Sequence, residues 1–560
     1  MKIKTLLTAL ALVWGLPSIY GQQATVEENV PLSTVYFPLH KAPPRKEIRH
    51  RLSTHPQDND LLQTSARATG DYLYKEFPTT GEIKGVVILA AYADVHFSVS
   101  DDSIRTLLSN RYNADNYTEE VKFNEYSDIY GEYVSLDITI PGSARDYFRD
   151  QSFGQFTPSF DVVGPITLDS IRAYYGANNA SGNDKNAKAM FTEACQKAFS
   201  QGLTDFTDYD NDGDGVVDFV YVVYAGCDEA QTDFEEAIWA KATSISLTLE
   251  NGMKIGRSVC SSELVIDLDE VAGIGTFVHE FSHVLGLPDF YNTSAVDFTM
   301  DVWSIMDYGM YNAEGFVPNA YTSFERYSLG WIPMHTLDQP ATMSIGTTEK
   351  EGKGYRIFTS TIDSTNITAA DTASFYVIET IRQEGWNLYA ANNHGEGIPP
   401  IQGLLISEVT YNAAAWRNNR VNVEANHRYC IVPANNIYHY KNPGMHLFGA
   451  EVVDPKTQQV FINTAFTIDS TPASITQFGA AMDKPLTNIR YDAETGKTTF
   501  NFCGGKPETP DTPQNPDDTE IENLELSIQH SGIIYDLQGR PVANPSKGIY
   551  ILNGKKVIIK

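Results

Sequence analysis

One short stretch constrains this chain more than any other, TFVHEFSHVLGLPDFYN at residues 276–292. On a helix, side chains four positions apart lie on one face, so His279 and His283 point in the same direction with Glu280 beside them. Two imidazoles in this arrangement bind one metal ion, and HExxH is the pattern of zinc peptidases. Gly286 favours a left-handed backbone that ends the helix and turns the chain back. The stretch therefore predicts a metal-binding helix followed by a sharp turn.

The turn brings a third ligand within reach of the same ion. Asp289 completes the pattern HExxHxxGxxD, and three protein ligands with a bound water form the hydrolytic type of zinc site. We therefore expect Zn²⁺ held by His279, His283 and Asp289. A rival interpretation keeps the enzyme and takes its third ligand further downstream, where Glu325 is the nearest candidate.

A second motif, WSIMDYG at residues 303–309, follows the helix. It resembles the Met-turn that lies beneath the zinc in metzincins, with Met306 as the methionine. Tyr308 matches a tyrosine that in several metzincin families ligates the zinc or hydrogen-bonds the transition state. The Met-turn favours Asp289 over Glu325 as the third ligand.

These residues predict a zinc metalloendopeptidase that hydrolyses peptide bonds in proteins. Zinc lowers the pKa of a bound water, Glu280 acts as general base, and Tyr308 hydrogen-bonds the oxyanion as it forms. The alternative is a surface-displayed binding protein or adhesin with an inactive peptidase fold. The intact Glu280 counts against that alternative, because a decayed enzyme usually loses its base or a ligand.

An aspartate-rich segment, DYDNDGDGVVDF at residues 208–219, predicts a second metal site. Its carboxylates fit D-x-D-x-D-G-x-x-D, in which alternate side chains surround one Ca²⁺ and Gly215 permits the turn. A shifted register that starts at Asp208 places Gly213 at the turn instead. Neither register ends in the bidentate Glu of an EF-hand, so we expect a structural loop. The predicted calcium ligands are Asp210, Asp212, Asp214 and Asp218.

Two further segments accompany these motifs, GEIKGVVILAAYADVHFS at residues 81–98 and ARDYFRDQSFGQFTPSFDVVGPITL at residues 144–168. The first predicts a buried strand. Together with the helix, the Met-turn and residues 319–331, they resemble the catalytic domain of the immune inhibitor A family of secreted bacterial metallopeptidases. The resemblance covers about residues 81–331. It implies a metzincin-like α/β (α+β) domain with a twisted mixed sheet and an active-site helix, and a similar Asp-rich loop in the family favours calcium.

The N-terminal region predicts export and latency. Residues 1–21 carry lysines and then a short apolar run, which is typical of a secretory signal peptide. Residues 22–80 are polar and interrupted by prolines, and we interpret them as a propeptide that blocks the site. This segment contains no cysteine, which excludes a thiol latch from it. Asp58 or Asp60 could bind the zinc instead, although a solvated turn is the favoured interpretation of each.

Charge and cysteine content narrow the partners and the location. Acidic residues outnumber basic ones by 71 to 41, and the net charge of −30 argues against nucleic acid or an anionic membrane as a partner. No later stretch is apolar enough to span a bilayer. We expect a secreted monomer, either released or attached to the cell surface. The five cysteines leave at least one unpaired, and the first three could form one bridge: Cys195, Cys227, Cys260, Cys430 and Cys503.

Three segments follow the predicted peptidase domain. Residues 332–503 contain short strand-like runs and predict a β-rich accessory domain. Residues 504–520 are rich in Pro, Asp and Thr and predict a linker. Residues 521–560 resemble the C-terminal sorting domain that the type IX secretion system of Bacteroidetes reads, which implies secretion machinery as a partner. A small carbohydrate-binding or packing module is the alternative for this last segment.

Overall fold

The computed structural model divides the chain into two compact units, Met1–Gly505 and Lys506–Lys560, and each is described by itself. The predicted signal peptide, nearly all of the predicted propeptide with Asp58 and Asp60, and residues 506–520 of the predicted linker lie outside the described residues. The structure describes residues 77–127, 132–180, 182–232, 234–265, 270–295, 297–359, 371–390, 400–438, 443–453, 459–505, 522–524, 534–535, 548–552 and 555–559.

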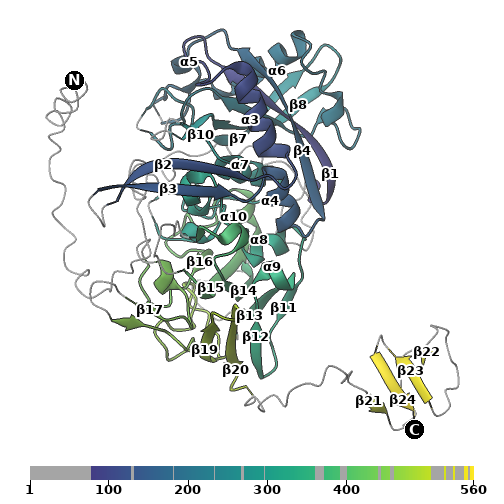
Figure 1. Ribbon diagram of the computed structural model, residues 1–560, viewed down its shortest axis with the longest axis vertical. Coiled ribbons are helices and arrows are strands. Elements are labelled where there is room, and N and C mark those ends of the chain that lie inside the picture. Colours follow the sequence, from purple (N-terminus) through teal and green to yellow (C-terminus); the bar gives the residue numbers. More distant parts are fainter. Residues whose placement is uncertain are drawn as a thin grey trace. The chain divides into compact units, whose positions relative to one another are not determined.

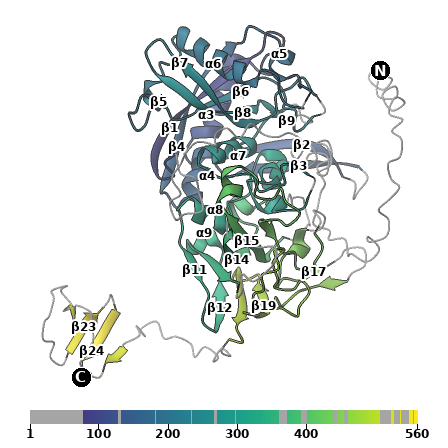
Figure 2. The same ribbon diagram turned by 180° about the vertical axis from the view of Figure 1, so that it is seen from behind.

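A curled, mainly parallel sheet forms the first half of the large unit (Figures 1 and 2). Its strands run in the order β4-β1-β6-β8-β5, all parallel, and β7 adds to β8 in the antiparallel direction. The predicted buried strand is confirmed in β1, whose last seven residues are all buried, as expected for a strand covered on both faces. The strands are β1 (Gly81–Ala91), β4 (Phe156–Thr167), β5 (Val216–Val217), β6 (Val220–Tyr224), β7 (Lys241–Thr248) and β8 (Lys254–Ser262).

Helices cover both faces of this sheet, and the alternation of side chains along β1 shows how. Val87 and Leu89 belong to one core cluster, and Val86 and Ile88 belong to another, because successive side chains of a strand point to opposite faces. The first cluster contains residues of α3 (Asp101–Asn113), α4 (Ala144–Gln151) and α7 (Gly275–Val284), and the second contains residues of α6 (Ala187–Ser200). The remaining short elements here are β2 (Glu119–Ser127), β3 (Glu132–Ile140), α5 (Arg172–Gly176), η3 (Thr207–Tyr209), β9 (Leu264–Val265) and β10 (Glu270–Val271).

Helix α7 carries the HExxH motif, and glycines fix both of its ends. A Cβ atom on Gly275 would lie 2.0 Å from the carbonyl oxygen of Met310, so a side chain would push the helix away from the segment that follows it. Gly286 has φ of 102°, which confirms the predicted left-handed turn. The Gly286 N–H donates to the His283 carbonyl, and the Leu287 N–H donates to the Ser282 carbonyl. These two hydrogen bonds end the helix. The chain then continues through η4 (Asp301–Trp303), η5 (Tyr308–Gly315) and α8 (Ser323–Ser328).

Residues after Trp331 form two larger, mainly antiparallel sheets and a two-stranded sheet of β17 and β18. Of the larger sheets, one runs β11-β13-β14-β15-β16 and the other runs β12-β20-β19. The elements are β11 (Met334–Thr336), β12 (Ala341–Ile345), α9 (Thr348–Glu351), β13 (Gly354–Phe358), β14 (Asp371–Ile381), η6 (Gly385–Asn387), β15 (Gly403–Asn412), α10 (Ala413–Arg417), β16 (Tyr429–Ile431), η8 (Pro443–His446), β17 (Val452–Val453), β18 (Val460–Phe461), β19 (Leu486–Asp492) and β20 (Lys497–Phe502).

The hydrophobic core continues across residue 331. Phe281 of α7, Phe375 of β14 and Tyr429 of β16 belong to one cluster of buried side chains. In both ribbon views α7 lies between the main sheet and strands β14 and β15 (Figures 1 and 2). The β-rich region is therefore packed against the underside of the helix that carries the motif.

The C-terminal unit contains a small four-stranded sheet in the order β21-β24-β23-β22. The strands are β21 (Glu522–Leu524), β22 (Ile534–Tyr535), β23 (Gly548–Leu552) and β24 (Lys555–Ile559).

Two further expectations concern cysteines and membranes. All five cysteines are unpaired, so the bridge considered among Cys195, Cys227 and Cys260 does not form. Cys195 and Cys260 are fully buried in the core on the α6 side of the sheet, where they act as small apolar side chains. Among the described residues, no helix is long and apolar enough to cross a membrane.

Candidate metal centre

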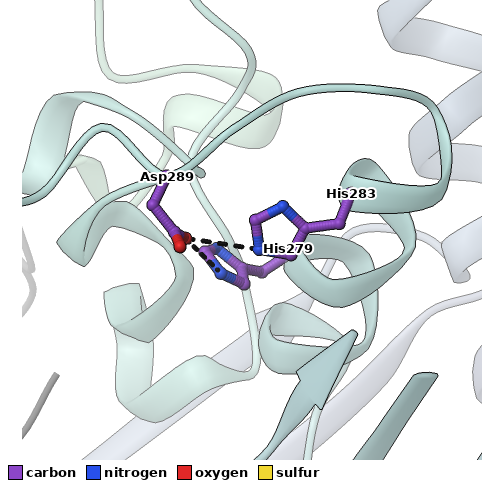
Figure 3. Close-up of side chains that lie close together, drawn as sticks. All are labelled: His279, His283 and Asp289. Atoms are coloured by element: carbon purple, nitrogen blue, oxygen red, sulfur yellow. Dashed lines mark ion pairs between the residues drawn. The ribbon is translucent and has the colours of Figure 1, made fainter. Parts of the chain in front are cut away.

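The structure brings His279, His283 and Asp289 together (Figure 3). The two histidines project from successive turns of α7, and Asp289 reaches them from the loop that follows Gly286. Each histidine Nε2 lies 3.3 Å from Asp289 Oδ1. All three side chains are at most 3% exposed. The turn predicted at Gly286 therefore places a carboxylate oxygen opposite two imidazole nitrogens.

Backbone carbonyls fix the orientation of both imidazole rings. His279 Nδ1 lies 2.8 Å from the Ile305 carbonyl oxygen, and His283 Nδ1 lies 2.8 Å from that of Leu287. A carbonyl only accepts, so Nδ1 carries a proton in each ring, and Nε2 is the nitrogen left to bind a metal once it is deprotonated. The Ile305 carbonyl belongs to the Met-turn segment and the Leu287 carbonyl to the turn after α7. Both segments thus fix the orientation of the two histidine rings.

The three converging atoms fit a zinc ion. Within the part of the chain that the structure describes, none of these atoms takes part in a hydrogen bond of good geometry. Buried polar atoms without a partner cost free energy, and a bound cation would satisfy all three at once. Two imidazole nitrogens and one carboxylate oxygen are the donor set of a catalytic zinc site with an open position.

The charged side chains of the cluster shift one another's pKa values. Burial alone would raise the pKa of Asp289, but the adjacent His283 and His279 hold it well below its ordinary value. Burial alone would lower the pKa of His283, but the charge of Asp289 raises it to about 9. Asp289 is therefore an anion at neutral pH, the form that binds a cation.

Glu280 is buried next to His279 and His283, the candidate ligands on α7. Its side chain is 2% exposed, and burial raises its pKa to about 7, against the opposing charges of His279 and His283. The charge of Lys241 also opposes this rise. A carboxyl group with a pKa near neutrality can both accept and return a proton at physiological pH.

The segment predicted to form a Met-turn is hydrogen-bonded through its backbone to the loop that carries Asp289. The Phe290 N–H donates to the Met306 carbonyl over 2.8 Å, and Met306 is fully buried. Tyr308 begins η5, where its N–H donates to Asp307 Oδ1, and its side chain is 1% exposed. The tyrosine predicted from the motif is therefore held in the buried segment directly beyond the methionine.

Two other tyrosines near the site were not expected from the sequence. Burial raises the pKa of Tyr291, and a hydrogen bond to Asp289 raises it further. Burial likewise raises the pKa of Tyr311, with contributions from the charges of Glu280 and Asp289, and its ring centroid lies 5.3 Å from that of Tyr308. Their spacing from predicted site residues was the sequence signal that could have identified them. Tyr291 lies two residues after Asp289, and Tyr311 lies three residues after Tyr308.

The rival third ligand, Glu325, has a different role. Its Oε1 accepts a hydrogen bond from Ser304 Oγ and its Oε2 accepts one from the Thr322 N–H. Thr322 and Glu325 form a capping box at the start of α8. The structure therefore brings Asp289, and not Glu325, to the two histidines.

The aspartate-rich loop gathers three of its four predicted ligands. Carboxylate oxygens of Asp210, Asp212 and Asp214 lie within 4.8 Å of one another. Asp218 instead accepts hydrogen bonds from the N–H and the side-chain amide of Asn211. Asp210 itself accepts from three backbone N–H groups of the loop, those of Gly213, Asp214 and Gly215.

Both glycines that the two registers required are left-handed, Gly213 with φ of 76° and Gly215 with φ of 84°. Asp208, which starts the shifted register, forms an ion pair with Lys84 at 3.0 Å. The loop is thus held by its own backbone amides and by Lys84, and a calcium ion in it stays a prediction.

Comparison with known proteins points in the same direction as the cluster. The sequence model of the family described as immune inhibitor A peptidase M6, catalytic domain, matches residues 77–333. These matches support a metallopeptidase. Immune inhibitor A of Bacillus thuringiensis subsp. alesti is 25% identical over 274 residues, which cover 43% of this chain and 38% of that protein. Pre-pro-metalloprotease PrtV of Vibrio cholerae is 24% identical over 314 residues, which cover 49% of this chain and 33% of that protein. The chain thus spans between 33% and 38% of the length of these relatives.

Proposed function

We propose that this chain is an exported zinc-dependent endopeptidase that cleaves protein substrates. The observation that carries the proposal is the convergence of His279 Nε2, His283 Nε2 and Asp289 Oδ1 beside the buried carboxyl group of Glu280. All four residues lie inside the segment that matches the peptidase family.

Each side chain of the site has its own role in the proposed reaction. His279, His283 and Asp289 hold the ion, which when bound supplies an electrophile that polarises the scissile carbonyl and acidifies the attacking water. Glu280 takes a proton from the attacking water and returns it to the leaving amine. Tyr308 donates a hydrogen bond to the carbonyl oxygen as negative charge develops on it.

The wider organisation belongs to the same proposal. Residues 1–21 direct export, residues 22–80 keep the enzyme latent, and residues 521–560 are read by a type IX secretion system. The separate compact unit with its own small sheet supports the last of these roles. A Ca²⁺ ion at Asp210, Asp212 and Asp214 braces the loop before β5, with Asp218 supporting the loop from its hydrogen bonds to Asn211.

The test of the activity is Glu280→Ala in the processed enzyme. The variant should keep one zinc per chain and lose casein hydrolysis by at least about 100-fold, because general acid–base catalysis contributes that much or more. The chelator 1,10-phenanthroline should abolish hydrolysis by the parent enzyme, and added Zn²⁺ should restore it. Hydrolysis of casein by Glu280→Ala at the parental rate would refute the assignment of the base.

The second candidate function is a binding protein with an inactive peptidase fold. Absence of proteolysis under any condition after removal of the N-terminal segment, despite bound zinc, would favour it. The convergence of His279, His283 and Asp289, with the buried Glu280 beside them, supports the enzyme over the binding protein.

A further inference from the structure

Asn419, in the turn after α10 of the β-rich region, contacts the third candidate ligand although it lies 130 residues further along the chain. The Asp289 N–H donates to Asn419 Oδ1 over 2.6 Å, and Asn419 Nδ2 donates to Asp289 Oδ2 over 2.5 Å. Asn419 is 1% exposed and Asp289 is fully buried. One side-chain amide thus engages both the backbone and the side chain of Asp289.

This contact determines which carboxylate oxygen faces the histidines. Oδ2 is held by Asn419, and Oδ1 lies 3.3 Å from each histidine Nε2. An amide can accept at one end and donate at the other, whereas a carboxylate can only accept and an apolar side chain can do neither. Asparagine therefore suits a position that must bind an N–H and a carboxylate of the same residue.

The turn that carries Asn419 is itself well anchored. Asn419 has φ of 50°, a left-handed conformation that asparagine tolerates better than most residues. Its N–H donates to the Trp416 carbonyl, and its own carbonyl accepts from Thr293 Oγ1. Asn422, three residues on, donates to the Phe290 carbonyl over 2.7 Å. The loop with Asp289 is thus seated on this turn at several successive positions.

We propose that Asn419 is a positioning residue for the metal ligand Asp289, so that the region after Trp331 completes the metal centre of the peptidase. This inference rests on the proposed function, because it assigns Asp289 to a metal ion. Removal of a residue that hydrogen-bonds a metal ligand typically lowers metal affinity or activity by roughly 10- to 100-fold. The β-rich region then contributes to catalysis through a single side chain as well as through packing.

The informative variant is Asn419→Gly in the full-length chain. Glycine keeps the left-handed backbone available, so the substitution removes the amide with little added backbone strain. Asn436→Gly is the matched control for the backbone, because Asn436 is also left-handed, with φ of 56°, and is exposed. Asn422→Ala is the control for loss of a buried amide, because the Asn422 side chain bonds backbone groups alone: Phe290 O, Tyr429 O, Arg428 N and Tyr429 N.

The primary measurement is the dissociation constant for Zn²⁺, obtained by competition with a fluorescent chelator, together with the Tm of the metal-free form. Asn419→Gly should weaken Zn²⁺ binding by at least roughly tenfold, while Asn436→Gly stays at the parental affinity. Asn422→Ala should lower the Tm of the metal-free form at least as much as Asn419→Gly does, with a much smaller loss of affinity. If Asn419→Gly does not fold, Asn419→Ser, which is too short to reach both groups of Asp289, takes its place.

Two results would overturn the positioning role. One is a Zn²⁺ affinity of Asn419→Gly within twofold of the parent. The other is a loss of affinity no greater than that of Asn422→Ala at the same Tm. The proposed function fails separately: a parent chain that binds Zn²⁺ but hydrolyses no protein after processing contradicts the peptidase, while the affinity comparison still decides the role of Asn419.

Discussion

Two groups of side chains in this protein look alike in sequence and differ in structure. Both the HExxH helix and the aspartate-rich loop place potential ligands at short, regular spacings. The first group, His279, His283 and Asp289, is buried, and its three facing atoms form no hydrogen bond of good geometry within the described residues. In the second, Asp212 and Asp214 are exposed, and Asp210 is already bonded to three backbone N–H groups.

The difference shows what makes a cluster of ligands informative. A buried polar atom without a partner is costly, so its presence indicates that something else completes the site. An exposed carboxylate is hydrated, and a turn that uses it to accept backbone N–H groups is stable without an ion. Spacing alone carries less weight than spacing combined with burial.

The largest expected effect is the loss of one buried ligand. His283→Ala should weaken Zn²⁺ binding by more than about 100-fold, because even an outer partner of a ligand is worth 10- to 100-fold. Peptide hydrolysis should fall with it. Asp212→Ala is the matched control and should keep both zinc content and activity. Parental Zn²⁺ affinity in His283→Ala, measured by chelator competition, would remove the distinction between the two groups.

The parts of the site that sequence could predict are local. The face shared by His279 and His283, the turn at Gly286 and the reach of Asp289 all depend on residues within about one helical turn or one tight turn of each other. The buried strand β1 was predictable for the same reason, because its apolar run is continuous.

The role of Asn419 could not be predicted. Asn419 reaches Asp289 across 130 residues, through the packing of the β-rich region against α7, and no local pattern encodes that contact. Asp218 accepts hydrogen bonds from Asn211, a short-range contact that the spacing of the carboxylates did not reveal, and its calcium role stays a prediction. Turn chemistry of this kind is visible only once the backbone path is known.

Glu408 differs from both groups, because its carboxyl group is buried and its hydrogen-bond donors are neutral. Glu408 of β15 is 4% exposed, and its Oε1 accepts hydrogen bonds from the Gln477 N–H and Cys430 Sγ. Burial raises the pKa of Glu408 from 4.5 to about 7. The folded protein therefore holds a proton that the unfolded chain releases, so stability should fall as pH rises from about 4.5 to about 7.

Glu408→Gln tests the direction of this pH dependence, because glutamine keeps a hydrogen-bond acceptor and cannot ionise. The variant and the parent should have similar free energies of unfolding near pH 4. At pH 8 the variant should be more stable by about 2 kcal/mol, allowing for relaxation around the ionised group. Urea unfolding at both pH values measures the difference. A constant difference across this range would show that Glu408 is ionised in the folded state.

A smaller effect is expected from Asp210, which serves the loop even without an ion. Asp210→Ala removes the acceptor for three backbone N–H groups at a partly exposed turn. It should lower the free energy of unfolding by about 1 kcal/mol in the presence of EGTA. Thermal unfolding with EGTA isolates this contribution from any bound Ca²⁺. An unchanged Tm would show that the loop does not depend on its own hydrogen bonds.

The smallest expected effect is that of Asp212→Asn, which tests whether the Asp212 carboxylate binds Ca²⁺ or only accepts a hydrogen bond within the turn. Its carboxylate accepts one hydrogen bond, from the Asp214 N–H, which lowers the pKa of Asp212, but its desolvation and the neighbouring Asp214, Asp218 and Asp210 raise it overall. In EGTA, Asp212→Asn should change the free energy of unfolding by less than about 0.5 kcal/mol, as surface substitutions do. In millimolar Ca²⁺ the parent should gain Tm and the variant should gain less, because binding to the folded state alone stabilises it. If Ca²⁺ leaves the parent's Tm unchanged, the exposed loop is a turn held by its own amides, and the buried histidine cluster is then the single metal site for which this chain's described residues give structural support.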